Sequence, residues 1–580
     1  MIKVENLSYS FPEKDLYHNI SFTLEEDQHC AFIGSSGTGK STLVEIMMNP
    51  DDYMFTGKLE IDPNCRIGYV SQFSKLEENS GITVYEYVSE EFQRLQEKIN
   101  AICVEMESSS DLDSLLEAYQ QTLDAFQAID GDNFESNIRK KLTLAKLDKL
   151  ENLKVSQLSG GEFKLIQVIK ESMIKPDLII MDEPDVFLDF KHLNALKELI
   201  NAHNGMMLVI THNRYLLHHC FNKIIHLENT QLQEFDGGYM EYNLSLLQKK
   251  IELQELAVAD AEEIERNKKM VDKLRFNATY FTCASRGRAL HARVTHLERL
   301  EARKIKEPFV EIKQPKIQLR AEYELTEDIP AIKVSNYSVA FEEELLKNVS
   351  FEIGSKDKVA LIGPNGTGKT TLLRDIYRNN HKAIQIHEDA KVAFLSQLQG
   401  EMLKESNTIE EEFFEVGFQT YNEIQVYLKD YGFPKELMKQ KIESLSGGEK
   451  NLLQLAKISA SKANLLLFDE PTSHLDTYSQ LALEQAITDF NGAILMVSHD
   501  FYTIANCVDY ILLIEDQTVR KLSVRKFRKM MYENHYDREY IEIEQKKKEV
   551  ETKIALALKD KNFALAKVLS EELEELIQLL

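Results

Sequence analysis

The sequence has no long hydrophobic run and no closely spaced cysteines, and these absences exclude several classes of protein. No segment approaches the roughly 18 apolar residues that a membrane-spanning helix needs. The first five residues do not have the pattern of a signal peptide. The six cysteines are scattered, which argues against disulfide frameworks, zinc sites and iron–sulfur clusters. We therefore expect a globular, cytoplasmic protein with reduced thiols.

Proline and glycine are nearly absent between residues 239 and 308, where Gly287 is the only interruption before Pro308. This composition predicts long helices rather than a flexible tether. Apolar residues recur at heptad-like spacing on both sides of the middle: Leu244, Leu247, Ile251 and Val258, then Leu290, Val294 and Leu297. The pattern predicts an antiparallel helical pair.

What the chain does contain is one set of nucleotide-handling motifs, present twice in the same order. Each copy begins with a glycine-rich loop between an apolar run and a helical pattern, the setting of a phosphate-binding loop. Its backbone N–H groups suit phosphates, Lys40 or Lys369 reaches the outer phosphates, and Ser41 or Thr370 suits Mg²⁺. The loops comprise Gly34, Ser35, Ser36, Gly37, Thr38, Gly39, Lys40, Ser41 and Thr42, and Gly363, Pro364, Asn365, Gly366, Thr367, Gly368, Lys369, Thr370 and Thr371.

Downstream, each copy has an apolar strand that ends in two carboxylates. The first carboxylate, Asp182 or Asp469, suits Mg²⁺, and the second, Glu183 or Glu470, can polarise the attacking water. A histidine and a glutamine complete each set. We expect the histidine to contact the γ-phosphate and the glutamine to contact the metal and water. These residues are His212 and His499, and Gln72 and Gln397.

A Leu-Ser-Gly-Gly-Glu motif lies between glutamine and carboxylates in both copies, with Ser159, Gly160, Gly161 and Glu162 in the first and Ser446, Gly447, Gly448 and Glu449 in the second. With this motif the chain resembles the ATP-binding cassette family. The resemblance implies that each such motif completes the opposite copy's ATP site. It also places Phe11 and Phe341 where cassettes carry an aromatic that stacks on adenine; the alternative is that both are ordinary strand aromatics.

The spacing of the copies locates an insertion in the first one. The offset is 325 from Gln72 to Gln397 but 287 from Leu158 to Leu445, so the first copy has 38 more residues in between. Helix-like patterns within about 85–135 predict a helical hairpin arm there. Additional length in an ordinary helical subdomain is the alternative.

The net charge of −26 argues against a nucleic-acid partner, but the outer part of the linker contradicts this average. Between 268 and 293, seven basic residues accompany one acidic residue, and aromatics lie at the turn. Such a surface suits phosphate contacts and stacking on unpaired bases of RNA. The candidates are Lys268, Lys269, Lys273, Arg275, Tyr280, Phe281, Arg286, Arg288 and Arg293. Alternatively, the cations pair with acidic residues of the chain itself.

Two cassettes, an arm and a basic linker together resemble the ABC-F family of ribosome-associated ATPases. The implied fold is α/β, with two tandem ATP-binding cassette (P-loop NTPase) domains joined by a long antiparallel α-helical linker. We expect the first cassette at 1–240, the linker at 241–310, the second cassette at 311–525 and a helical extension at 526–580. The resemblance implies a monomeric ATPase that binds ATP and Mg²⁺, and whose linker reaches ribosomal RNA and tRNA near the exit and peptidyl sites.

Other functions remain open at this point. The chain could be a transport motor that docks onto separate membrane subunits, or an ATP switch that binds a non-ribosomal protein. Within the ribosomal reading, translation control, rescue of stalled ribosomes and antibiotic resistance are alternatives, and resistance is the least favoured. The first copy also departs from the family where Asp185, Val186 and Phe187 replace polar residues, from which we expect reduced turnover at the first site.

Overall fold

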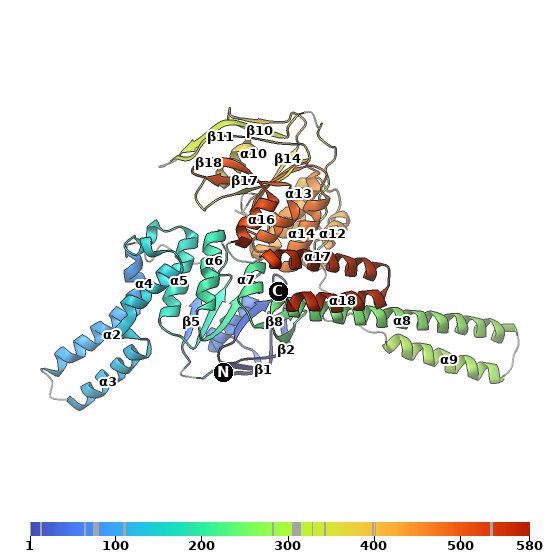
Figure 1. The fold of residues 1–580 in the computed structure, drawn as a ribbon. Coiled ribbons are helices and arrows are strands. Elements are labelled where there is room, and N and C mark those ends of the chain that lie inside the picture. The colour runs from blue at the N-terminus through green and yellow to red at the C-terminus, as the bar shows by residue number, and fades with distance from the viewer. Residues whose placement is uncertain are drawn as a thin grey trace. The chain divides into compact units, whose positions relative to one another are not determined.

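The computed structural model describes residues 2–11, 14–62, 65–72, 81–107, 112–186, 188–280, 284–303, 315–326, 329–340, 344–396, 400, 402–533 and 538–579. These residues form two compact units (Figure 1). One unit is Met1–Asp236 with Lys313–Met530, and the other is Gly237–Ile312 with Met531–Leu580. Within the first unit, residues 2–236 are called the first cassette and residues 315–530 the second cassette.

Each cassette is built on a six-stranded sheet whose strands are parallel except for the last one. The first sheet has the order β5 (Ile67–Val70), β6 (Leu178–Asp182), β7 (Met206–Ile210), β3 (His29–Ile33), β8 (Lys223–Glu228) and β9 (Gln231–Asp236). The second has the order β14 (Val392–Leu395), β15 (Leu465–Asp469), β16 (Ala493–Val497), β12 (Lys358–Ile362), β17 (Tyr510–Glu515) and β18 (Thr518–Ser523).

The order of these strands gathers the motifs at one edge of each sheet. All five residues of β6 and of β15 are buried, as expected for apolar strands that are covered on both faces. The strands β3, β6 and β7 run parallel, so their carboxyl ends lie at the same edge. The first phosphate loop, Asp182 and Thr211 follow these three strand ends, which explains why distant motifs meet.

A smaller antiparallel sheet packs over each core. Its strands are β2 (Lys14–Leu24), β1 (Ile2–Phe11) and β4 (Thr56–Glu60) in the first cassette, and β11 (Glu344–Ile353), β10 (Ile332–Ala340) and β13 (Ile384–Ile386) in the second. Buried side chains of this sheet, such as Val4 and Phe22, share a hydrophobic core with Leu43 of the phosphate-loop helix. The core thereby holds the base of the loop in place.

Helices surround both sheets. In the first cassette they are α1 (Lys40–Met48), α4 (Phe134–Leu144), α5 (Gly160–Met173), α6 (Phe190–Asn201) and α7 (Arg214–His219). In the second they are α10 (Lys369–Arg378), α11 (Ile409–Val416), α12 (Tyr421–Lys429), α13 (Gly447–Ser461), α14 (Thr477–Asp489) and α15 (Phe501–Cys507), followed by α16 (Val524–Glu533).

The range in which we predict an inserted arm holds α2 (Val84–Met106) and α3 (Leu112–Ala128), which pack against each other (Figure 1). Thr83 begins α2 with a capping box, because its hydroxyl accepts from the Glu86 N–H and Glu86 accepts from the Thr83 N–H. Phe92 of α2 is fully buried and stacks on Phe134 at a ring separation of 5.0 Å. The base of the arm is therefore anchored in the cassette.

The secondary-structure elements described in the second unit are all helices. The helices α8 (Tyr239–Tyr280) and α9 (Ala284–Arg303) pack side by side, and so do α17 (Arg538–Lys559) and α18 (Phe563–Gln578) (Figure 1). Helix α18 also packs on α8 through a core that includes Ile251, Ile554 and Leu569, with a Lys567–Glu255 ion pair at 2.6 Å. The C-terminal helices thus brace the first part of the linker.

Two points of the sequence-based fold prediction have an outcome here. The α/β class, with two tandem copies and a long helical linker, is confirmed. None of the helices in the described ranges combines the length and the apolar run that crossing a bilayer requires.

Candidate functional site

The two phosphate loops have the same conformation at their helix ends. Gly39 and Gly368 precede α1 and α10 with φ of 96° and 89°, a region that glycine enters without strain. The Lys40 ammonium donates to the Gly34 and Ser35 carbonyls at 2.8 and 2.9 Å, and Lys369 makes the equivalent bonds in the second loop. Burial lowers the pKa of both lysines. Each loop is therefore a curled backbone with a buried cation above a helix N-terminus, which fits a phosphate chain.

A hydroxyl and a carboxylate lie together at the start of each loop helix. Thr370 donates its hydroxyl to Asp469 at 3.1 Å. In the first cassette, Ser41 hydrogen-bonds Asp182, whose pKa burial raises to about 6. Hydroxyl and carboxylate oxygens are the ligands that Mg²⁺ prefers. These four residues would hold the ion, which would neutralise charge on the phosphates.

The adjacent glutamates have a backbone conformation that is rare for their residue type. Glu183 and Glu470 have φ of 45° and 52°, and each N–H donates at 2.9 Å to a neighbouring strand, at Ile210 and Val497. Such left-handed conformations are costly outside glycine and persist only where the surroundings impose them. Both carboxylates are therefore fixed in direction next to their phosphate loops.

The two glutamates differ in their partners. Glu183 accepts from Gln72 at 2.5 Å and from His474 of the second cassette at 3.3 Å. Burial by itself would raise the pKa of Glu183, but the His474 hydrogen bond and nearby cations lower it. Glu470 accepts from the backbone N–H of His499 at 3.2 Å, and burial together with Asp469 raises its pKa to about 8. The two ATP sites are thus electrostatically different.

Of the predicted γ-phosphate histidines, His212 is buried and His499 is mostly buried. Burial and the Lys40 charge lower the pKa of His212, and burial and the Lys369 charge do the same for His499. His499 Nε2 lies 3.5 Å from Glu470 Oε1. A neutral imidazole at this place can donate one N–H to a phosphate oxygen without adding a buried charge.

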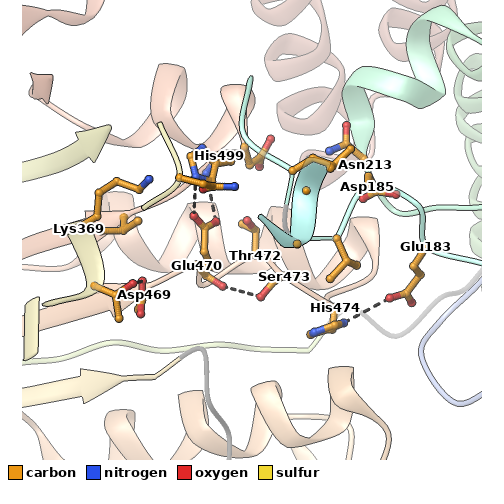
Figure 2. A pocket seen from close by; sticks show the side chains of 18 of the residues that line it. Glu183, Asp185, Asn213, Lys369, Asp469, Glu470, Thr472, Ser473, His474 and His499 are labelled. Atoms are coloured by element: carbon orange, nitrogen blue, oxygen red, sulfur yellow. Dashed lines mark hydrogen bonds and ion pairs between the residues drawn. The ribbon is translucent and has the colours of Figure 1, made fainter. Parts of the chain in front are cut away.

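A cavity of about 560 Å³ lies between the two cassettes and is lined by both (Figure 2). Its walls come from Ser159, Gly160 and Gly161 of the first cassette and from Lys369, Glu470 and His499 of the second. Figure 2 shows Glu470 and His499 on one side, and His474 reaching Glu183 on the other. The volume is in the range of small-molecule sites. The structure therefore brings the first Leu-Ser-Gly-Gly-Glu motif to the second phosphate loop.

The serine and glutamate of this motif also form a local cap. Ser159 accepts from the Glu162 N–H at 3.3 Å, and Glu162 accepts from the Ser159 N–H at 2.8 Å, which begins α5. Ser446 and Glu449 repeat the arrangement before α13. Each capping box fixes the first turn of its helix, whose N-terminus lies at the cassette interface.

The second motif packs directly against the first phosphate loop. A Cβ on Gly448 would lie 2.2 Å from Ser36 Oγ and 2.6 Å from the His474 carbonyl oxygen. We predict that Gly448→Ala penalises this packing by about 1–3 kcal/mol, because backbone must move. The steady-state rate of ATP hydrolysis should fall by a factor that corresponds to this free-energy cost. Gly81→Ala is the control, since Gly81 lies outside the nucleotide motifs and a Cβ there meets nothing within 4 Å; equal losses in both variants would contradict the prediction.

Two aspartates form hydrogen bonds between the cassettes, and the sequence motifs did not identify them as site residues. Asp189 Oδ1 accepts from the His192 N–H at 3.0 Å, and its Oδ2 accepts from the Asn365 N–H at 3.3 Å. Asp476 caps α14 in the same way and accepts from the Ser36 N–H at 3.4 Å. Each aspartate caps its own helix while it holds the opposite phosphate loop. Their recurrence at the shared offset of 287 was the available signal.

The altered loop of the first cassette lies in a segment that also reaches the other site, and the reduced turnover expected at the first site stays a prediction. Asp189, at the end of that loop, contacts Asn365 of the second phosphate loop. His474, in the intact loop of the second cassette, contacts Glu183 of the first site. Because these contacts cross the interface, the segment that ends at Asp189 also touches the second site.

Asp185 of this loop also lies beside the first site, as a partly buried carboxyl next to Thr211. It accepts from the Thr211 hydroxyl at 2.6 Å, and burial raises its pKa to about 6. Since this lies above the free value of 3.8, the folded protein loses stability as the pH rises from about 4 to about 6.

We therefore predict that Asp185→Asn raises the melting temperature at pH 8, equivalent to about 2–3 kcal/mol, and that the gain shrinks toward pH 4. Thermal denaturation without nucleotide at several pH values measures this. Asp124→Asn, in the arm, is the control. A gain that is the same at every pH would show that the carboxyl charge is not responsible.

Several predicted site residues lie elsewhere than expected or outside the described residues. Phe11 is 46% exposed at the end of β1 and packs edge-on against Tyr9 at 5.4 Å. Tyr17 of β2 is the aromatic that touches the first loop, by donating its hydroxyl to the Gly39 carbonyl. Phe341, Gln397 and Phe187 lie outside the described residues.

The basic residues of the linker lie on α8 and α9. Lys268, Lys269, Lys273 and Arg275 are exposed on α8, next to the exposed Phe276. Intrahelical ion pairs join Lys269 to Glu265 at 2.7 Å and Arg275 to Asp272 at 3.9 Å. Arg293 of α9 contacts the Met270 sulfur at 3.2 Å. Phe281 and the side chains of Tyr280, Arg286 and Arg288 lie outside the described residues.

Comparisons with known proteins agree with this geometry. A family model described as ABC transporter matches residues 17–186 and 346–473. ABC transporter F family member 5 of Arabidopsis thaliana is 26% identical over 89% of this chain and 75% of its own length. The energy-dependent translational throttle protein EttA of Escherichia coli is 28% identical over 87% of this chain and 90% of its own length.

A likeness among solved structures supports the fold. The structure titled "Model of ribosome-bound archaeal Pelota and ABCE1" matches 91% of this chain and 80% of that chain, with a TM-score of 0.56 at 16% identity. Two phosphate loops, two intact Leu-Ser-Gly-Gly-Glu motifs and a composite cavity accompany the family match. The chain belongs to the ABC transporter family, as a tandem-cassette ATPase of its ABC-F branch.

Proposed function

We propose that this chain is an ATP-dependent ribosome-binding ATPase that modulates translation through its helical linker, with hydrolysis driving its release. The basic outer part of the linker is the observation that carries the proposal. Lys268, Lys269, Lys273 and Arg275 are exposed on α8 although the whole chain has a net charge of −26. Segregation of cations to one helical surface of an acidic chain is the electrostatic footprint of a nucleic-acid contact.

The intrahelical ion pairs do not remove this surface. Exposed pairs such as Lys269–Glu265 contribute about 0.2–1 kcal/mol at most, so a phosphate can replace the carboxylate at small cost. The relative EttA, whose name describes a translational throttle, matches over 87% of this chain and 90% of its own length. We extend the proposal to ribosomal RNA and tRNA near the exit and peptidyl sites as partners, and to a monomer in the cytoplasm.

ATP and Mg²⁺ serve this function as ligands held between the cassettes. Each phosphate loop would bind the phosphates, and Ser41 with Asp182, or Thr370 with Asp469, would hold the metal. Glu183 and Glu470 would position water, assisted by Gln72 and Gln397, and the histidines would contact the γ-phosphate. Because the opposite cassette completes each site, bound ATP would favour the paired arrangement, and its hydrolysis would weaken it.

Co-sedimentation tests this proposal against the alternative of a transport motor. Purified protein is mixed with ribosomes or with membrane vesicles, each with ATP, with ADP and without nucleotide. We expect ATP-dependent recovery with ribosomes and none with vesicles. Recovery with vesicles alone would support a motor subunit instead, and recovery with neither would favour a switch for a non-ribosomal protein.

A further inference from the structure

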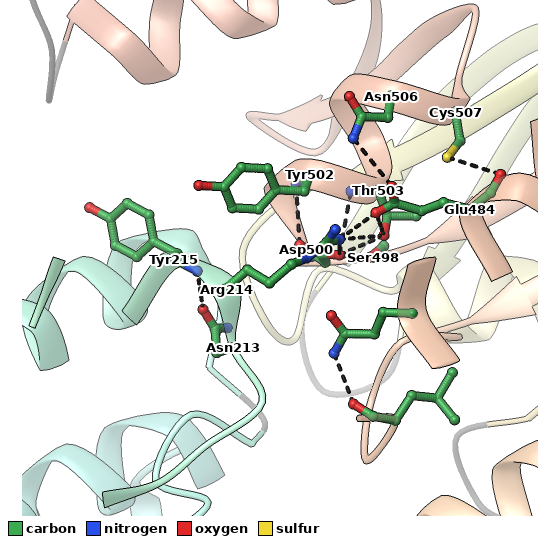
Figure 3. Close-up of polar contacts among 12 residues, drawn as sticks. Asn213, Arg214, Tyr215, Glu484, Ser498, Asp500, Tyr502, Thr503, Asn506 and Cys507 are labelled. Atoms are coloured by element: carbon green, nitrogen blue, oxygen red, sulfur yellow. Dashed lines mark hydrogen bonds and ion pairs between the residues drawn. The ribbon is translucent and has the colours of Figure 1, made fainter. Parts of the chain in front are cut away.

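A charge network joins the cassettes beside the cavity that the second phosphate loop lines (Figure 3). Its cation is Arg214, the first residue of α7, two positions after His212. The guanidinium donates to Glu484 of α14 and, at 2.6 Å, to Asp500, the residue that caps α15. It also lies 4.9 Å from the centre of the Tyr502 ring. All of these partners belong to the second cassette.

The network is almost fully shielded from water. Arg214 and Glu484 are 7% and 8% exposed. The Thr503 hydroxyl lies within 2.5 Å of Asp500 Oδ2 and 3.1 Å of Glu484 Oε1, and Asn506 donates to Glu484 at 3.3 Å. Two carboxylates and one guanidinium thus share a low-dielectric pocket, where removal of one partner leaves an uncompensated charge.

A second contact fastens the same segment of the first cassette. Gln480, one turn before Glu484 on α14, donates to the His212 carbonyl at 3.3 Å. Residues 212–214 are therefore held by α14 at one end and by α14 and α15 at the other. Arg214 thus connects the segment that contains His212 to Asp500, which caps α15 and directly follows His499.

The network exists once, although the cassettes are copies. At the shared offset of 287, Phe501 stands where the first cassette has Arg214, and Asn213 stands where the second has Asp500. Phe501 packs on Phe527 at a ring separation of 5.8 Å, and Phe190 packs on His499 at 5.7 Å. The first histidine segment is thus held by charges and the second by aromatic packing.

We propose that Arg214 is a positioning residue that latches the first histidine segment to the second cassette and thereby favours the closed pairing. Its partners lie across the interface, so its contacts are gained when the cassettes close and lost when they separate. This inference rests on the proposed ATP-driven closure. The inference goes beyond that proposal, because closure then depends on one asymmetric charge network that no nucleotide motif contains.

The test uses the full-length chain with Glu183→Gln and Glu470→Gln as the parent, so that ATP is not consumed. Fluorescent labels, one on each cassette, report their approach by energy transfer as ATP is added. Arg214→Met should raise the ATP concentration for half-maximal closure about tenfold, within the usual range for coupling between sites. The melting temperature without ATP should stay unchanged in conditions where the cassettes are apart. Arg94→Met, an exposed arginine of the arm, is the matched control.

A double-mutant cycle separates a latch from a general loss of packing. Glu484→Gln with Asp500→Asn, added to Arg214→Met, should recover part of the loss, because no carboxylate is then left without its cation. If the parent closes with ATP and Arg214→Met closes at the same ATP concentration, the latch is overturned while ATP-driven closure stands. No recovery in the triple variant would also overturn the latch. A parent without ATP-dependent approach would overturn ATP-driven closure, and the latch with it.

Discussion

Replacing Glu183 and Glu470 together by glutamine is expected to reduce ATP turnover by about 100- to 10,000-fold, the usual contribution of a positioned base. Glutamine keeps the size of each side chain and one oxygen to accept from Gln72 or from the His499 N–H. It removes the ionisable carboxyl group that would polarise water and accept its proton. ATP should therefore still bind and the cassettes should stay paired.

The measurements are phosphate release and ribosome co-sedimentation in ATP. Ribosome-bound protein should persist in the variant and should leave in the wild type as ATP is consumed. Glu60→Gln with Glu344→Gln is the matched control, because it removes one exposed strand carboxylate from each cassette. Release of the double variant as fast as wild type would count against both glutamates as the catalytic pair.

Removing four cations from the linker is expected to flatten the salt dependence of ribosome binding. Each phosphate contact contributes a slope of about 0.7–0.9 in log K against log salt, so replacing Lys273, Arg275, Arg286 and Arg288 by glutamine should reduce the slope by roughly 3. The reduction is smaller if some of these side chains stack or pair internally. Basal ATPase should change little, since none belongs to a nucleotide motif.

A charge-matched control removes four exposed lysines of the cassettes, Lys58, Lys333, Lys347 and Lys441. It changes the net charge equally but leaves the linker intact, so the slope should remain. If the linker variant instead lost thermal stability while its ribosome affinity and slope stayed at wild-type values, its cations would serve the protein's own surface. The RNA interpretation would then be wrong.

Features whose conformation depends on residues close in the chain could be predicted from the amino-acid sequence. Phosphate loops, apolar strands and the Ser159–Glu162 capping box are local, because strand, glycine and cap preferences act over a few residues. The absence of proline between 239 and 308 likewise predicted the helices α8 and α9. The order of motifs was enough to predict two cassettes.

The contacts between the cassettes, in contrast, became known from the folded molecule. His474 and Glu183 are 291 residues apart, Arg214 and Glu484 are 270 apart, and Asp189 and Asn365 are 176 apart. No periodicity or spacing marks such pairs, because they depend on how two folded surfaces pack. The same packing places the altered loop of the first cassette beside the second site. The asymmetry of the two sites is therefore a property of the interface, although every residue that causes it is visible in the sequence.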